Sequence, residues 1–139
     1  MNTSKALGPV CLVAFVVDDA EGAVDFYMRV CGLELHRRIP SGTPGSDFIF
    51  LKSGDLMVEL MSRKIGMFRN LPLGFHHMSF YTDDIDVACA DLAQRGARIL
   101  TPPNPAPGKH GFRMAEFQGP EGIFLKLFWK KPEAAQDNQ

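Results

Sequence analysis

The chain has 139 residues, with 45% hydrophobic and 22% charged residues, the composition of an ordinary globular domain that buries a core of its own. Its formal net charge of −1 lacks the basic excess that binding to nucleic acid or to an anionic membrane requires, so we expect neither as a partner. Three cysteines without Cys-x-x-Cys spacing argue against a disulfide framework or a zinc knuckle. They favour a reducing, cytoplasmic location with each thiol as small core filler.

The hydrophobic pattern predicts two similar runs of secondary structure in chain order. The first run comprises a strand at Val10–Val17, a helix at Ala20–Val30, a strand at Leu33–Arg38, a loop at Ile39–Gly45, and strands at Asp47–Lys52 and Leu56–Met61. The second comprises a strand at 77–82, a helix from Ile85 to Gly96, and strands at Ala97–Thr101, Arg113–Gln118 and Ile123–Trp129.

The two runs are an internal repeat with a shift of 65 residues. Phe15 corresponds to Phe80, and Asp18-Asp19 corresponds to Asp83-Asp84. Because each acidic pair stands directly before a helix, we expect capping residues there rather than catalytic acids. The repeat predicts a single domain over residues 1–139, with modules at about 9–61 and 74–129, a connector at 62–73 and a frayed tail at 130–139.

Each run reads strand-helix-strand-strand-strand, and the turn Gly119-Pro-Glu-Gly122 precedes the last strand. With Phe26-Tyr27 followed by Cys31-Gly-Leu, the chain resembles the vicinal oxygen chelate superfamily, which includes glyoxalase I, methylmalonyl-CoA epimerase, extradiol dioxygenases and the bleomycin resistance proteins. The resemblance implies an α+β fold in which two pseudo-symmetric βαβββ modules form a curled mixed sheet around a cavity. Family members often pair, so it also implies a homodimer.

The family usually binds a divalent metal at four inward-facing positions, two in each module. Here two of these positions match Glu59 and His77, and the other two are Leu12 and Lys126. Leucine has no donor atom, and an ammonium group repels a cation. We therefore expect no cofactor, with a weak divalent metal at Glu59 and His77 as the alternative.

Strand alternation predicts an apolar, aromatic pocket into which three ionisable side chains project. In the catalytic interpretation, Glu59 or His77 is the base and Lys126 stabilises negative charge. In the structural interpretation, Glu59 and Lys126 form an ion pair where relatives bind metal. The expected substrate-binding residues are Leu12, Met57, Met61, Ser79, Tyr81, Phe124, Phe128 and, from the resemblance alone, Arg113.

Three functions stay open. The first is an atypical lyase or isomerase that moves a proton on a small, oxygen-rich organic acid, which the retained Glu59, His77 and Lys126 favour. The second is a metal-free binding or resistance protein that sequesters an apolar or aromatic molecule, which the inward-facing aromatic residues favour. The third is a metalloenzyme whose site is completed across a dimer.

Overall fold

The computed structural model describes residues 7–105 and 111–130, so all but the first residue of the predicted frayed tail lies outside the described residues. The chain divides into two compact units. The N-terminal unit is Cys11–Met78, and the C-terminal unit is Ser79–Gln139 together with Met1–Val10. Each is an α+β unit with one α-helix, which agrees with the predicted fold class. Among the described residues, no helix has the length and apolar character needed to cross a membrane.

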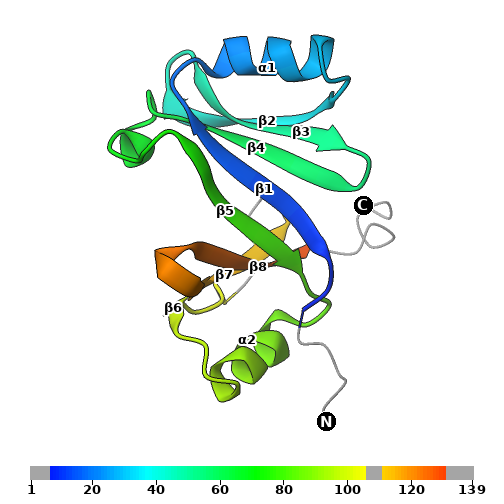
Figure 1. Ribbon diagram of the computed structural model, residues 1–139, viewed down its shortest axis with the longest axis vertical. Coiled ribbons are helices and arrows are strands. Elements are labelled where there is room, and N and C mark those ends of the chain that lie inside the picture. The colour runs from blue at the N-terminus through cyan, green and yellow to red at the C-terminus, as the bar shows by residue number, and fades with distance from the viewer. Residues whose placement is uncertain (1–6, 106–110, 131–139) are drawn as a thin grey trace. The chain divides into compact units, whose positions relative to one another are not determined.

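The N-terminal unit contains a mixed sheet in which β1 lies beside β4 in parallel and the other pairs are antiparallel. Its strand order is β2-β3-β4-β1, and Figure 1 shows α1 along one side of these strands. In chain order the elements are β1 (Val10–Val17), α1 (Ala20–Arg29), β2 (Glu34–Thr43), β3 (Ser46–Ser53), β4 (Leu56–Ser62), the 3-10 turn η1 (Gly66–Phe68) and the first part of β5 (Gly74–Tyr81).

The two faces of this sheet carry different clusters, as strand alternation requires. On the face toward α1, Val58 and Leu60 pack with Ile49, Leu51 and the helix residue Val24. On the other face, which we call the open face, the buried cluster is Leu12, Ala14, Val16 and Met61. Alternate residues of β1 and β4 therefore fall on opposite faces, one toward α1 and one away from it.

The C-terminal unit contains the rest of β5 and an antiparallel sheet of order β8-β7-β6, with α2 beside it (Figure 1). Its other elements are α2 (Ile85–Gln94), β6 (Ile99–Thr101), β7 (Phe112–Gln118), the 3-10 turn η2 (Pro120–Gly122) and β8 (Phe124–Lys130). Its core joins α2 to one face of the sheet through Ile85, Ala88, Cys89, Leu92, Ala115, Phe117 and Leu127.

The acidic pairs before the helices include the predicted caps. Asp19 accepts a hydrogen bond from the Gly22 amide at the start of α1, and Asp84 accepts one from the Val87 amide at the start of α2. The neighbouring Asp18 instead forms a bidentate pair with Arg63, at 2.7 and 2.8 Å. In the first pair, therefore, Asp19 caps the helix and Asp18 forms a surface ion pair.

Two predictions in the N-terminal unit are wrong. Residues 39–45 are not a loop, because β2 continues through Pro40 to Thr43. β2 is the edge strand of its sheet, with a neighbouring strand on one side only. A proline, which has no N–H to donate, is tolerated there, and the pairing with β3 shifts register between Pro40 and Thr43. Cys31 is exposed after α1 rather than core filler, whereas Cys89 is buried as predicted.

Candidate functional site

Glu59 and His77 meet in the N-terminal unit. Glu59 lies in the middle of β4 with its side chain 16% exposed, and the His77 side chain on β5 is 1% exposed. The distance from His77 Nε2 to Glu59 Oε1 is 3.8 Å. This distance is longer than a direct hydrogen bond, so the imidazole and the carboxylate face each other without one between these two atoms. The structure thus brings these two predicted residues close together.

A second imidazole contacts His77 from the adjacent position in β5. His76 Nδ1 lies 2.8 Å from His77 Nδ1, although alternation predicts opposite directions for the two side chains. In such a contact one nitrogen donates and the other accepts, so the two Nδ1 atoms share one proton. A neutral His77 that accepts from His76 carries its proton on Nε2, the nitrogen that faces Glu59.

The surroundings of Glu59 on the open face are apolar. Leu12 and Met61 are buried there, with Met57 packed against the same cluster. Strand register also places Phe50 directly opposite Glu59, a residue that the sequence interpretation missed. Alternation along β3 could have predicted this position, because Ile49 and Leu51 face α1 and the residue between them must face the other way. Apolar neighbours lower the local dielectric constant and strengthen the interaction of Glu59 with His77.

The other predicted ionisable residue, Lys126, lies in the C-terminal unit on β8. Its ammonium nitrogen is 3.9 Å from Glu116 Oε2, and the Lys126 side chain is 17% exposed. Glu116 stands directly opposite Lys126 on β7, and the sequence interpretation did not identify it. The described acidic residue nearest to Lys126 within its own unit is therefore Glu116.

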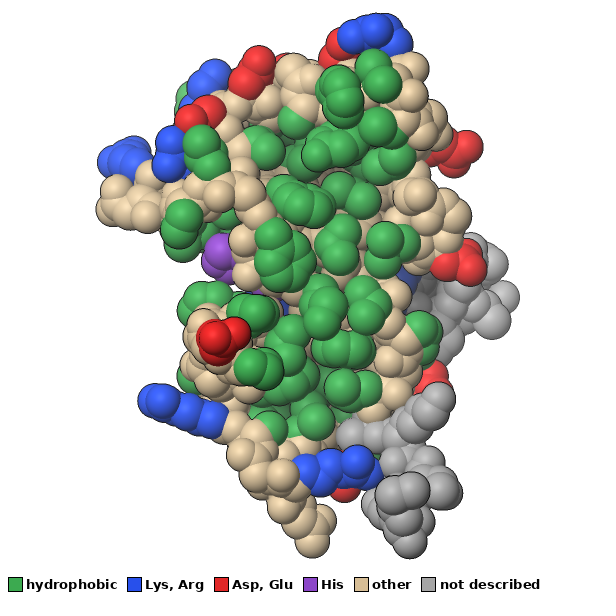
Figure 2. Space-filling view, viewed as in Figure 1, with side chains coloured by type: hydrophobic (Ala, Val, Ile, Leu, Met, Phe, Trp, Pro, Cys, Tyr) green, Lys and Arg blue, Asp and Glu red, His purple; other side chains and the backbone are tan. Residues whose placement is uncertain are grey.

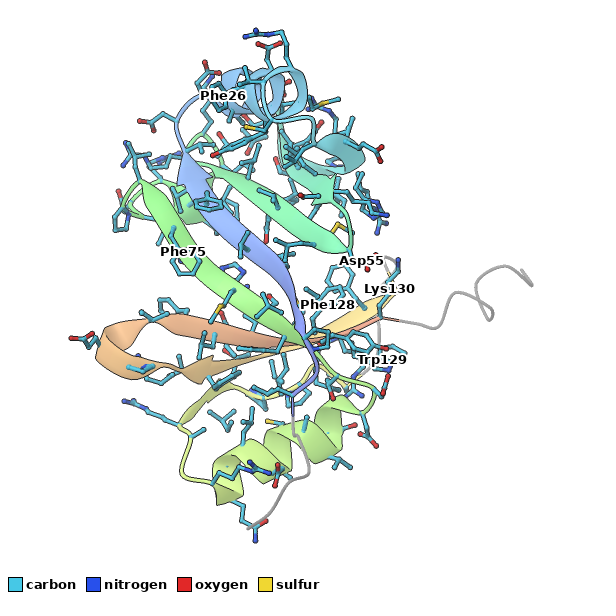
Figure 3. The ribbon with its side chains drawn as sticks, turned by 45° about the vertical axis from the view of Figure 1, so that its right-hand side comes forward. Phe26, Asp55, Phe75, Phe128, Trp129 and Lys130 are labelled. Carbon is cyan, nitrogen blue, oxygen red and sulfur yellow. The ribbon has the colours of Figure 1, made fainter. Side chains whose placement is uncertain are left out.

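Aromatic side chains flank Lys126 along β8. Phe124 is 39% exposed, and Phe128 stacks on Phe112 with ring centroids 5.3 Å apart. Phe128 and Trp129 leave β8 on opposite sides (Figure 3), and Trp129 packs with the α2 core. The remaining predicted residues of this unit, Ser79 and Tyr81, are buried and half-buried on β5.

Arg113 has a different environment from the one expected. Its guanidinium forms a bidentate pair with Asp86 of α2 at 3.0 Å, and its Nε donates to the Asn104 carbonyl. The hydrogen bonds from Arg113 hold the pKa of the Asp86 carboxyl below its ordinary value. Arg113 thus joins α2 to β7 through Asp86.

The donor set does not fit the metal centre that the family resemblance implies. Among residues 7–105 and 111–130, no three His, Cys, Asp or Glu side chains are placed to hold one ion. His77 directs Nδ1 to His76 and Nε2 to Glu59, and Leu12 has no donor atom. Two protein ligands fall short of the three or more that catalytic metal sites usually have.

The fold and these side chains define a class: a protein of paired β-α-β-β-β units that carries ionisable residues on sheet faces turned away from the helices. Residues 11–127 match the model of one family. The chain belongs to the Glyoxalase/Bleomycin resistance protein/Dioxygenase superfamily.

Named relatives agree with this family. The chain is 33% identical over 102 residues to the mitochondrial methylmalonyl-CoA epimerase of Bos taurus, an alignment covering 68% of this chain and 58% of that protein. It is 24% identical over 124 residues to lactoylglutathione lyase GLX1 of Arabidopsis thaliana, covering 86% and 44% of the two chains. The chain thus spans about half the length of these two relatives. A crystal structure of a methylmalonyl-CoA epimerase shares the fold, with a TM-score of 0.73, 23% identity, and coverage of 93% of this chain and 100% of that chain.

Proposed function

We propose that the protein is an isomerase- or lyase-type enzyme that moves a proton at the carbon next to a carbonyl group, in a small oxygen-rich organic acid or its thioester. The observation that carries this proposal is the buried His77, which lies between Glu59 and His76 beside an apolar sheet face. The similarity to an epimerase and to a lyase supports it, because both names denote reactions on small acyl compounds.

In the proposed reaction, Glu59 removes the proton from the carbon, and the electron pair of the broken C–H bond moves to the carbonyl oxygen. His77 then donates a hydrogen bond from Nε2 to the enolate oxygen, with His76 fixing its tautomer. Delivery of a proton from solvent water to the opposite face inverts the carbon, and Glu59 then releases its proton to solvent. Transfer of the Glu59 proton to a neighbouring atom instead isomerises the molecule.

We propose a mechanism without a metal step, because Glu59 and His77 alone are fewer ligands than a catalytic ion usually has. We propose that any divalent metal bound by these two residues is weak. The alternative of a site completed by a second subunit predicts a stoichiometric ion instead, and elemental analysis of the protein purified without added metal separates the two.

We also propose a cytoplasmic homodimer. Hydrophobic side chains gather over β1 on the face drawn in Figure 2. Phe26 and Phe75, labelled in Figure 3, are 49% and 50% exposed, and Phe75 packs edge-on against Phe15. Exposed aromatic residues of this kind favour burial in an interface, which sedimentation analysis of Phe75→Ser against wild type would test.

A second function, sequestration of an aromatic compound without chemistry, is favoured by the stacked Phe112 and Phe128 in the C-terminal unit. Stacked rings of this kind, here half-buried, bind planar molecules without any need for a base.

The deciding experiment measures deuterium incorporation at the carbon next to the carbonyl of methylmalonyl-CoA and of S-lactoylglutathione in D2O. We expect exchange with the wild type, a loss of at least about a hundredfold with Glu59→Gln, and normal exchange with the matched control Glu34→Gln, which changes an exposed glutamate of β2. Parallel samples with a chelator and with added zinc test the metal alternative. Absence of exchange in both compounds, or full exchange by Glu59→Gln, would contradict the proposal.

A further inference from the structure

Three polar side chains form a row across the sheet of the C-terminal unit. Thr101 on β6 pairs with Glu116 on β7, and Glu116 pairs with Lys126 on β8. Directly opposed residues share one face of a sheet. The alternate residues Ala115, Phe117 and Leu127 pack against α2, so the row lies on the face turned away from that helix.

The contacts within the row direct the Glu116 carboxylate toward the lysine. Thr101 Oγ1 donates a 2.7 Å hydrogen bond to Glu116 Oε1, which leaves Oε2 as the oxygen nearest Lys126, at 3.9 Å. A charge-assisted N–H···O bond is about 2.7–2.9 Å long. The Glu116–Lys126 contact is therefore a Coulomb interaction without a hydrogen bond.

The Lys126 ammonium thus has unused donor capacity in a largely enclosed position. An ammonium group has three N–H donors, and within the described residues Lys126 makes the single Glu116 contact and no hydrogen bond to a side chain. Only 17% of its side chain is exposed, compared with 34% for Glu116. A charge at such depth interacts more strongly with an incoming anion than a surface lysine does.

The neighbours of Lys126 indicate what accompanies the anion. Phe124 and Phe128 stand two residues before and after it on the same face, and Phe128 is extended sideways by its stack with Phe112. Aromatic faces on both sides suit an apolar or planar group attached to the anion. One ammonium partly neutralised by Glu116 suits a singly charged group better than a doubly charged phosphate.

We propose that Lys126, positioned by Glu116 and Thr101, binds the carboxylate of a small organic acid whose carbon skeleton lies against Phe124 and Phe128. The inference concerns the C-terminal unit alone and does not depend on the proposed function. The carboxylate accepts hydrogen bonds from the ammonium, and Glu116 and Thr101 are positioning residues that do not touch the ligand.

The test compares phenylacetate with phenylacetamide, which has nearly the same shape and no charge, by isothermal titration or saturation-transfer NMR. We expect the wild type to prefer the acid by at least about tenfold, because a hydrogen bond to a charged group corresponds to roughly ten- to a hundredfold in affinity. Lys126→Met should remove the preference and leave phenylacetamide binding unchanged. Lys130→Met, at an exposed lysine on the same face of β8, is the matched control and should keep it.

The positioning roles have their own variants. Glu116→Gln, which can still accept from Thr101 and no longer neutralises the ammonium, should keep at least the wild-type preference for the acid. Glu116→Leu, which loses the positioning contact, should show a preference about threefold or more below that of Glu116→Gln. A purely structural role would weaken both probes equally. If Lys126→Met does not fold, as judged by circular dichroism, Lys126→Gln carries the same expectation.

An unaltered preference in Lys126→Met, or no preference in the wild type, would overturn the inference. The Glu59→Gln variant distinguishes failure of this inference from failure of the proposed function. If it abolishes deuterium exchange and Lys126→Met still prefers phenylacetate, only the inference fails. If Lys126 governs acid binding and no substrate exchanges deuterium, only the proposed reaction fails.

Discussion

Replacing His77 by leucine tests the centre of the proposed site most directly. The side chain is 1% exposed, and its ring contacts His76 at 2.8 Å and Glu59 at 3.8 Å. Loss of the hydrogen bond to His76 costs about 1 kcal/mol, and loss of the group facing Glu59 costs about another 1 kcal/mol. Leucine returns about 1 kcal/mol through apolar contact with the surrounding side chains. We therefore expect His77→Leu to lower the free energy of unfolding by only about 1 kcal/mol.

The catalytic effect should be much larger than this change in stability. Loss of a positioned acid–base group lowers a rate by about 10²–10⁴, so we expect at least a hundredfold slower deuterium exchange. His76→Leu removes the same 2.8 Å contact and leaves His77 facing Glu59, so its loss should stay near tenfold. Urea unfolding and the exchange assay together measure both quantities. Equal losses in the two variants, or exchange by a folded His77→Leu within threefold of wild type, would refute the assignment.

Three further outcomes are expected. Burial raises the pKa of the Cys11 thiol to about 11, so iodoacetamide at pH 8 should modify the exposed Cys31 first, and faster labelling of Cys11 in a mass spectrum would contradict this. Hydrogen bonds from Arg113 lower the pKa of the Asp86 carboxyl below its ordinary value of 3.8, so their contribution to stability is present above that value and lost as the pH falls through the lowered pKa. Asp86→Asn should accordingly lower the melting temperature at pH 7, with the difference from wild type vanishing well below pH 3.8. Leu60→Ala, at a fully buried core position, should reduce the free energy of unfolding by about 2–5 kcal/mol, whereas a loss below about 1 kcal/mol would show that the core collapses around the change.

The part of the protein that the sequence determined is the part governed by local periodicity. Alternation in β1 and β4 separated the residues that pack against α1 from those on the open face, because successive side chains of a strand point to opposite sides. Asp19 and Asp84 cap their helices because unpaired amide groups at a helix start need a nearby acceptor. The repeat predicted the order of elements, and with it the family.

Contacts between strands were decided only by the tertiary structure. Nothing in the local pattern indicates that Glu116 stands opposite Lys126, that Phe50 stands opposite Glu59, or that Arg113 turns to Asp86. The first two pairs depend on strand register and the third on how α2 packs against β7, and long-range packing sets both. The continuation of β2 through Pro40 likewise follows from its place at the end of the strand order, where a missing N–H leaves no partner unsatisfied. Periodicity assigns a side chain to a face, but only the pairing of distant strands decides which side chain it meets there.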